Sequence, residues 1–323
     1  MEPGLVTTIL PVYNRAAMLR EAVASVIAQT YRPVEIVIVD DGSTDDTPRV
    51  ADELGRLHPE ARVVHQPNGG PGVARESGRA LARGEFIQHL DSDDVLLPRK
   101  LELQVAALRA HPECGAAYGI TRWRRRDGTL DPHAWGRTGE RIDTMFPAML
   151  QSRWWTTHTP LYRAALLDAA GPWLPLRIEE DWEYDARVAS RNVRLCFVDE
   201  EVAEVRSHEE PALSGRVTQD SLRDRARAHE AILGHARRAG IAENAPEMRH
   251  FSRELFLLAR QCGAAGLARE SERLFSLARD ASGQERDRLQ FRLYAALART
   301  AGWSTAGKLA TMSDRLRWRS SRS

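Results

Sequence analysis

The stretch VEIVIVDDGST, residues 34–44, is a run of β-branched and apolar residues that ends in two carboxylates and a glycine. Such a run is typical of a strand that is buried on both faces. Apolar residues recur at helical spacing on either side of it, in MLREAVASVIAQT (18–30) and in DDTPRVADELGRLH (45–58). A strand between two helices at this spacing indicates βαβ units, and therefore a parallel sheet with helices on both faces.

The same alternation extends over the first third of the chain. We expect strands in LVTTILPVYN (5–14), ARVVHQPNGG (61–70) and EFIQHLDSDD (85–94), and a helix in VARESGRALARG (73–84). Open α/β sheets bind their ligands at the carboxyl ends of the strands. Four loops that carry polar residues should therefore face one crevice.

The middle third is a mixture of aromatic, polar, glycine and proline residues. Residues 118–141 and 151–173 are of this kind, which favours irregular loops that shape a substrate site over a second core. Within the second stretch, Trp154 and Trp155 either offer a stacking surface to a substrate or belong to the core.

Composition limits the class of protein. With 323 residues, 42% of them hydrophobic, the chain can bury a large core. The 46 Lys and Arg nearly balance the 45 Asp and Glu, so the net charge of +1 does not favour nucleic acid as a partner. Three widely spaced cysteines are typical of a reducing cytoplasm. We expect neither a secretory signal nor a membrane-spanning helix.

The last third has a helical pattern from about residue 216. Residues 255–281 predict two helices joined by a Gly-Ala turn. The end of the chain is basic, because residues 285–323 hold nine Lys or Arg and three Asp or Glu, about +6 in net charge. This end is a candidate contact for an anionic membrane or an acidic partner.

Carboxylates crowd the end of the strand at residues 85–94. Asp91, Asp93 and Asp94 fall within four positions, and two carboxylates spaced i, i+2 can converge on a hard divalent cation. The alternative is a solvated acidic turn that caps the next helix.

Two further loops have the composition of a nucleotide site. Asp40 and Asp41 suit hydrogen bonds to a ribose hydroxyl or a base N–H, or they belong to an ordinary turn before a helix. In NGGPGVAR (68–75), Arg75 replaces the third glycine of a dinucleotide fingerprint, so an NAD site is not indicated. A glycine-rich approach to a helix N-terminus with Arg75 one turn inside still suits a phosphate.

A cluster of acids lies further along, in EEDWEYDAR (179–187). Neighbouring charges and partial burial would raise the pKa of one of these carboxyls and make it a usable general base. The alternative is a charged first turn of a helix. His208 is a lone histidine, and most lone histidines are structural or solvated.

Together these segments resemble the inverting GT-A type glycosyltransferases of family two, which transfer sugars from nucleotide-diphosphate donors. The matching segments are PVYNRAAMLREAVASVIAQTY (11–31), EIVIVDDGSTDDT (35–47), NGGPGVAR (68–75), ARGEFIQHLDSDDVLLP (82–98), GPW with EEDWEYDAR (171–187) and VRSHEEPALS (205–214). Their order is more specific than any one of them.

The resemblance implies roles by position. Asp181 would be the catalytic base, and Mn²⁺ or Mg²⁺ would be held by Asp93 with Asp91, and by His208. The donor-binding residues it implies are Pro11, Tyr13, Asp40, Asp41, Arg75, Asp91 and Ser92. The chain departs from the family pattern at Glu76, where Asn is usual, and at His89, where an aromatic residue is common.

The resemblance also implies an architecture. We expect an α/β fold of GT-A type, with a Rossmann-like, mainly parallel sheet and an α-helical C-terminal region. Residues 1–110 would bind the nucleotide sugar, residues 111–215 would bind the acceptor and carry the base, and residues 216–323 would form the helical region.

The expected activity is metal-dependent, inverting transfer of a hexose-type sugar, with a UDP-sugar as donor. The acceptor would be a carbohydrate, a glycolipid or another hydroxyl compound, in the synthesis of surface polysaccharide, glycolipid or glycoconjugate. We expect a cytoplasmic location with peripheral contact at the inner membrane face. The alternatives are a sugar nucleotidyltransferase and a non-catalytic nucleotide-sugar-binding scaffold.

Overall fold

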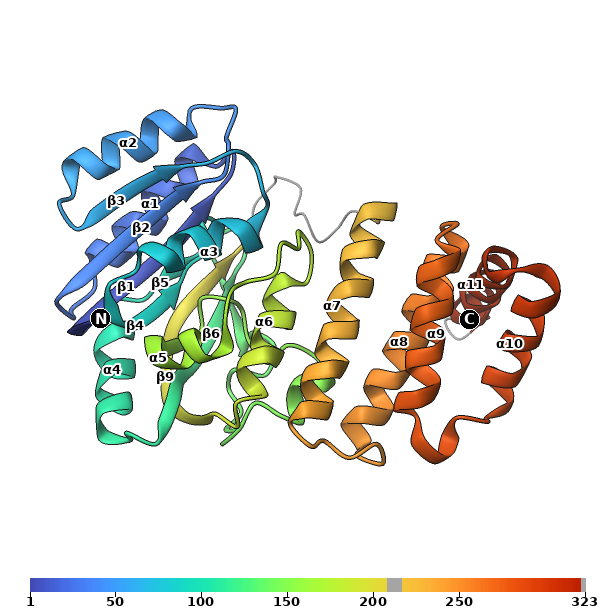
Figure 1. Cartoon of the computed structure of the whole chain (residues 1–323). Coiled ribbons are helices and arrows are strands. Elements are labelled where there is room, and N and C mark those ends of the chain that lie inside the picture. Colours follow the sequence, from blue (N-terminus) through green and yellow to red (C-terminus); the bar gives the residue numbers. More distant parts are fainter. Residues whose placement is uncertain (208–216, 321–323) are drawn as a thin grey trace. The chain divides into compact units, whose positions relative to one another are not determined.

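The computed structural model describes residues 1–207 and 217–320, and it divides into two compact units (Figure 1). The first unit comprises Met1–Met145 and Arg153–Pro211, and the second comprises Phe146–Ser152 and Ala212–Ser323. The first is an α/β unit and the second is helical. This confirms the expected α/β class with an α-helical C-terminal region.

The first unit is built on one sheet, in which nine strands belong to the described part of the chain. Its order is β3-β2-β1-β4-β8-β6-β9-β5, and β7 pairs with β6. Parallel pairs join β1 to β2, β1 to β4, β2 to β3 and β6 to β9, whereas β8 is antiparallel to β4 and β6. The strands are β1 (Glu2–Val12), β2 (Val34–Asp40), β3 (Ala61–His65), β4 (Gly84–His89), β5 (Val95–Leu96), β6 (Cys114–Arg124), β7 (Leu130–Ala134), β8 (Leu161–Arg163) and β9 (Arg194–Arg206).

Helices cover both faces of the sheet, and β2 shows why. Successive side chains of a strand point to opposite faces. Ile36 and Ile38 pack in a cluster with α1 and α2, whereas Val37 and Val39 pack with Ala74 of α3. The helices of this unit are α1 (Ala16–Ile27), α2 (Thr47–Leu57), α3 (Pro71–Leu81), α4 (Lys100–Ala110), α5 (Ala164–Ala170) and α6 (Glu180–Ala189).

The middle third is more regular than its sequence indicates. The expectation of irregular loops over residues 118–141 and 151–173 is wrong in part. The first stretch contains most of β6 (Cys114–Arg124) and all of β7 (Leu130–Ala134), and the second contains β8 (Leu161–Arg163) and α5 (Ala164–Ala170). Strand β6 was not predicted because its arginines are more typical of an exposed loop than of a strand inside a sheet. Arg122 and Arg124 are satisfied by Glu201 and Glu204 of the neighbouring β9, and cross-strand pairs of this kind stabilise a sheet.

Trp154 and Trp155 belong to the core. Their relative exposures are 2% and 0%, so neither ring offers a free surface to a sugar. Trp155 lies with its ring centroid 5.2 Å from that of Tyr118 of β6, and Arg137 covers Trp154 with its guanidinium carbon 3.9 Å from the ring centroid. Of the two alternatives for this pair, the core interpretation is confirmed.

The second unit contains the predicted helical hairpin. Its two helices, α8 and α9, join at a turn where Gly266 has φ +84°, a left-handed value that favours glycine. Among the described residues, no helix has the length and apolar character needed to cross a bilayer. The elements are η1 (Ala148–Leu150), α7 (Gln219–Arg238), α8 (Pro246–Ala264), α9 (Ala268–Ala281), η3 (Gly283–Glu285), α10 (Leu289–Ala301) and α11 (Trp303–Ser320).

Candidate functional site

The carboxyl ends of the first strands meet at one edge, because β1 is parallel to both β2 and β4. Val12 pairs with Asp40 across β1 and β2, so the loops after these strands start at the same level. Pro11 is half-buried within β1, and Tyr13, directly after the strand, has a relative exposure of 44%. The structure therefore places Pro11, Tyr13 and Asp40 at the predicted edge.

Asp41 organises the glycine-rich loop before α3. Its buried carboxylate accepts the backbone N–H groups of Gly69 at 2.8 Å and Gly70 at 2.7 Å. It also accepts the side-chain amide of Gln66 at 2.7 Å. Both oxygens are thus engaged by the chain, and a bound nucleotide would have to share or replace these contacts.

Asp40 is also engaged within the chain. Its carboxylate accepts the backbone N–H of Ser43 at 3.1 Å and lies 2.8 Å from Nδ1 of His65. The other ring nitrogen of His65 lies 3.1 Å from Asp52. Hydrogen bonds to Asp40 and then to Asp52 raise the pKa of His65. His65 was not predicted as a site residue, although its place at the end of a predicted strand could have suggested it.

Arg75 joins two of the predicted motifs. Its buried guanidinium donates from Nη2 to Asp91 at 2.6 Å and from Nη1 to Glu180 at 2.7 Å. The guanidinium carbon also lies 5.0 Å from the ring centroid of Trp173. The acid loop after β4 and the first turn of α6 therefore lie against the same cation.

The two carboxyls on Arg75 have opposite pKa shifts. Burial and the adjacent charge of Asp181 raise the pKa of Glu180 to about 7, against the opposing effect of Arg75. Burial also acts to raise the pKa of Asp91, but Arg75 outweighs it and holds that pKa below the usual value. The guanidinium of Arg75 thus lies between the ionised carboxylate of Asp91 and the carboxyl of Glu180, which takes up a proton near neutral pH.

A glycine allows α3 to approach this region closely. A Cβ at Gly72 would lie 2.3 Å from the backbone oxygen of Leu174 and 3.5 Å from Cβ of Glu180. The residue before Glu180, Glu179, has the left-handed φ of +59°. Such a backbone conformation costs energy in a residue other than glycine, and it is held here at the start of α6.

The three acids after β4 differ in their surroundings. Asp94 is buried and accepts the backbone N–H of Arg206 at 3.0 Å. Asp93 is one quarter exposed and has Nε of Arg15 at 3.7 Å. Burial, Asp94 and Asp91 together raise the pKa of Asp93. Ser92, between the acids, is buried.

Two of the acids after β4 form, with a histidine, a group that fits a divalent cation. Asp91, Asp94 and His158 can each offer one ligand atom, and the three atoms lie within 4.8 Å of one another. His158 is fully buried, and its Nδ1 lies 3.0 Å from Asp94 without a well-directed hydrogen bond. The raised pKa of the adjacent Asp93 reflects the repulsion between these carboxylates, and a bound cation would relieve that repulsion.

The predicted ligands relate to this group in different ways. Asp91 belongs to it, whereas Asp93 lies in the same loop outside it. His208 lies outside the described residues. His158 was not predicted as a ligand, because the threonine-rich loop around it carries no pattern of metal-binding residues.

Asp181, the predicted base, lies in the first turn of α6 with its side chain 24% exposed. It forms an ion pair with Arg153, and its other oxygen accepts the backbone N–H of Trp182 at 2.7 Å. Arg153 also lies 3.2 Å from the buried Asp185. Arg153, which holds the carboxylate of Asp181 in place, was not predicted as a site residue.

The two departures from the family pattern have structural explanations. His89 takes the place of an aromatic residue, with its ring centroid 5.1 Å from that of Trp173. Burial and the nearby Arg75 lower the pKa of His89 to about 3, so its ring is neutral. Glu76 accepts the backbone N–H of Trp173 at 3.1 Å and pairs with Arg79 at 2.7 Å.

Sequence comparisons give one consistent result. The family model described as glycosyl transferase family 2 matches residues 7–168. Chondroitin synthase of Escherichia coli is 38% identical over 126 residues, which cover 39% of this chain and 18% of that protein. Glycosyltransferase GlyG of Streptococcus pneumoniae is 38% identical over 99 residues, or 30% of this chain and 33% of that protein. The match thus spans a third or less of these relatives' own length.

Solved structures share the fold. S. aureus TarS in complex with UDP-GlcNAc has a TM-score of 0.67 at 18% identity, covering 96% of this chain and 92% of that one. Mannosyltransferase PcManGT from Pyrobaculum calidifontis, in complex with GDP-Man and Mn²⁺, has a TM-score of 0.54 at 20% identity, covering 98% and 88%. At these identities the likeness concerns the fold alone.

Proposed function

Because the chain belongs to glycosyl transferase family 2, we propose that it is a metal-dependent inverting glycosyltransferase that moves a sugar from a nucleotide-diphosphate donor to an acceptor hydroxyl. The observation that carries the proposal is the buried bridge of Arg75 to Asp91 and Glu180. It brings the acid loop after β4 and the neighbouring residues Glu180 and Asp181 into one site. This site lies at the sheet edge where folds of this class bind nucleotides.

A UDP-sugar is the donor that we expect, in line with the UDP-GlcNAc that TarS binds. The side chains at the ends of β1 and β2, namely Pro11, Tyr13, Asp40 and Asp41, would contact the base and ribose. Arg75 would lie near the nucleotide or its diphosphate, and Asp91 and Ser92 complete the set of donor-binding residues.

Asp181 acts as general base in this proposal. Its carboxylate takes the proton of the acceptor hydroxyl while that oxygen attacks the anomeric carbon. The bond between this carbon and the diphosphate breaks, its electron pair leaves with the diphosphate, and the configuration inverts. Arg153 orients Asp181 for the approach of the acceptor.

We propose Asp93 and Asp91 as the residues that would hold Mn²⁺ or Mg²⁺, with His208, outside the described residues, as a further ligand. The group of Asp91, Asp94 and His158 is the alternative set. The bound cation supplies positive charge beside the departing diphosphate. Arg75 adds a second, permanent positive charge on the same side, through its contact with Asp91.

The acceptor is a carbohydrate, a glycolipid or another hydroxyl compound, in the synthesis of surface polysaccharide, glycolipid or glycoconjugate. Chondroitin synthase among the relatives supports a polysaccharide setting. We place the activity in the cytoplasm, with peripheral contact at the inner membrane face through the basic end of the chain.

The test is calorimetric titration with UDP, GDP and dTDP, each with and without Mn²⁺, followed by a nucleotide-release assay with the matching sugar donor. Metal-dependent binding of one nucleotide together with its release from the sugar donor would support the proposal. Binding without turnover, across a panel of acceptors, would favour the non-catalytic scaffold. Binding of a nucleoside triphosphate in preference to the diphosphates would favour a sugar nucleotidyltransferase.

A further inference from the structure

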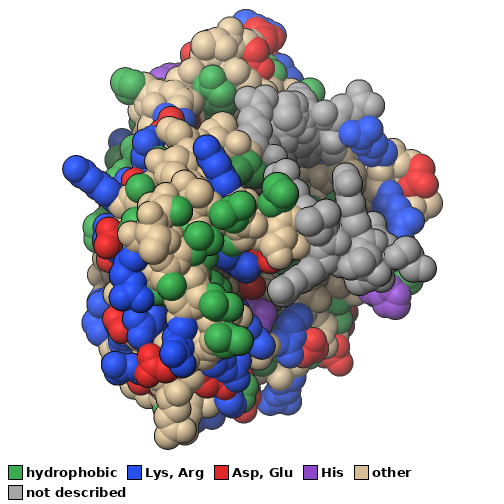
Figure 2. Space-filling model, turned by 90° about the vertical axis from the view of Figure 1, so that its right-hand side faces the viewer, with side chains coloured by type: hydrophobic (Ala, Val, Ile, Leu, Met, Phe, Trp, Pro, Cys, Tyr) green, Lys and Arg blue, Asp and Glu red, His purple; other side chains and the backbone are tan. Residues whose placement is uncertain are grey.

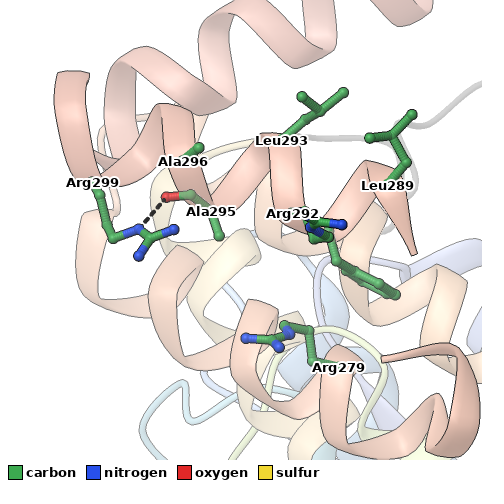
Figure 3. Close-up of a pocket in the computed structure, with 8 residues that line it drawn as sticks. Arg279, Leu289, Arg292, Leu293, Ala295, Ala296 and Arg299 are labelled. Atoms are coloured by element: carbon green, nitrogen blue, oxygen red, sulfur yellow. Dashed lines mark hydrogen bonds between the residues drawn. The ribbon is translucent and has the colours of Figure 1, made fainter. Parts of the chain in front are cut away.

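Helix α10 has one aromatic face and one face of leucine and arginine. The ring centroid of Phe291 lies 4.9 Å from that of Phe256, and that of Tyr294 lies 5.4 Å from that of Phe275. These contacts fix the inner face against α8 and α9. On the outer face, Leu289 and Leu293 have relative exposures of 68% and 61%. They stand one helical turn apart and point to the same side of α10 (Figure 3).

Arginines surround these leucines. Arg292 and Arg299 of α10 and Arg279 of α9 line a hollow of about 390 Å³ with Leu289 and Leu293 (Figure 3). Residues 289–301 contain no Asp or Glu. Within the described residues, neither Arg292 nor Arg299 has a carboxylate in ion-pair distance, and Arg299 donates to the backbone oxygen of Ala295 at 3.3 Å. Arg279 pairs with Asp287 at 3.0 Å, so the unbalanced positive charge among the described residues of this face is that of Arg292 and Arg299.

We propose that the outer face of α10, defined by Leu289, Arg292, Leu293, Ala296 and Arg299, docks on an anionic lipid bilayer. Exposed leucines on one helix face enter the boundary between head groups and acyl chains. Guanidinium groups beside them bind lipid phosphates, to which their planar donors are matched. Charge complementarity selects an anionic surface over a neutral one.

Other occupants fit this face less well. A second copy of the chain would bring the same unpaired arginines together across a two-fold axis, and this repulsion opposes dimerisation. Single-stranded nucleic acid is bound by aromatic rings beside basic groups, and the aromatic rings of α10 point inward.

The first turns of α11 carry the same combination. Leu309 and Met312 have relative exposures of 49% and 61%, and Lys308 is exposed beside them. In Figure 2, hydrophobic side chains lie among those of Lys, Arg, Asp and Glu. The first turns of α11 thus add an exposed leucine, methionine and lysine in the same unit.

Co-sedimentation of the full chain with vesicles tests the proposal. One set of vesicles is pure phosphatidylcholine, and the other contains phosphatidylglycerol as well. We expect binding to the second set only, and weaker binding as salt rises. The double variant Arg292→Gln/Arg299→Gln should bind about 25-fold more weakly, and Leu289→Ser/Leu293→Ser at least about 10-fold more weakly. The control is Arg56→Gln/Leu57→Ser on α2, which removes an exposed arginine and a leucine of 63% exposure and should bind as the wild type does.

A second measurement places the helix directly. The three native cysteines are buried, so Leu293→Cys can be labelled selectively with an environment-sensitive fluorophore. We expect a blue shift with phosphatidylglycerol vesicles and none with dextran sulfate, a soluble polyanion.

Three results would overturn the proposal: no sedimentation at low salt, sedimentation unchanged in both double variants, or equal loss in the α2 control. A Leu293 probe that responds to dextran sulfate and not to vesicles would assign the face to a soluble polyanion instead. No donor is present in either assay, so the outcome does not depend on glycosyl transfer.

Discussion

Nη1 of Arg75 donates to Oε1 of Glu180 at 2.7 Å, which ties α3 to the first turn of α6 across 105 positions of the chain. The same guanidinium holds Asp91, so its removal would leave the buried Glu180 and the partly exposed Asp91 without their positively charged partner. The geometry of the site therefore depends on this one arginine.

Arg75→Ala should lower the free energy of unfolding by about 3–5 kcal/mol, the range found when one partner of a buried ion pair is removed. Urea denaturation measures it. The control is Arg49→Ala, which breaks an ion pair on the surface of α2 and should cost about 1 kcal/mol or less. Equal losses in the two variants would show that Arg75 is not a structural bridge.

Asp181→Asn should leave nucleotide affinity nearly unchanged and reduce sugar transfer by about 10²- to 10⁴-fold, the usual contribution of a general base. Affinity is measured by calorimetry and transfer by nucleotide release. Asp199→Asn, at an exposed position on β9, serves as the control and should keep wild-type turnover. Wild-type turnover in Asp181→Asn would remove this residue from the role of base.

The pKa of Glu180 predicts a dependence of stability on pH. This pKa is about 7 in the folded protein, against an ordinary value of 4.5. Between these values the folded protein holds a proton that the unfolded chain has released, so stability falls as pH rises through the window. The contribution is fully present below the ordinary value and fully lost above about pH 7.

Glu180→Gln should remove this part of the profile. We expect the wild type to lose about 1–3 kcal/mol relative to the variant between pH 4.5 and 7, with no further divergence above pH 7. Urea denaturation of both proteins at intervals of half a pH unit gives the difference. Parallel profiles would mean that Glu180 titrates normally.

Asp93→Asn should abolish the part of nucleotide affinity that depends on Mn²⁺, because the amide is a weaker ligand for a hard cation than the carboxylate. His158→Gln is the informative comparison, since His158 lies with Asp91 and Asp94 in a group that can hold a cation. Calorimetry with and without Mn²⁺ covers both variants. Loss in His158→Gln but not in Asp93→Asn would assign the cation to Asp91, Asp94 and His158.

Gly72→Ala should destabilise the protein by about 1–3 kcal/mol, because the added methyl would overlap the backbone oxygen of Leu174. Gly234→Ala makes the same change inside α7, where the added methyl would have the end of the Arg238 side chain 3.5 Å away. There we expect a gain of about 0.5–1 kcal/mol from helix propensity. A common sign for both variants would contradict the close approach of α3 to residue 174.

The sequence by itself determined the elements whose signals are local. The β-branched runs of β1 and β2, the helical spacing of α1 to α3 and the hairpin of α8 and α9 were all predicted from periodicity. Acids at strand ends also predicted the edge of the sheet on which the candidate site lies, because parallel strands bring their carboxyl ends together.

Only the tertiary structure decided how charges are paired in the site. Arg153 lies 28 positions from Asp181, and His158 reaches Asp94 from a different loop, so no spacing in the sequence connects them. The same holds for β6, whose arginines look like loop residues until β9 supplies their glutamates. The physical reason is that burial and ion pairing depend on long-range packing, whereas helix and strand periodicity depend on near neighbours along the chain.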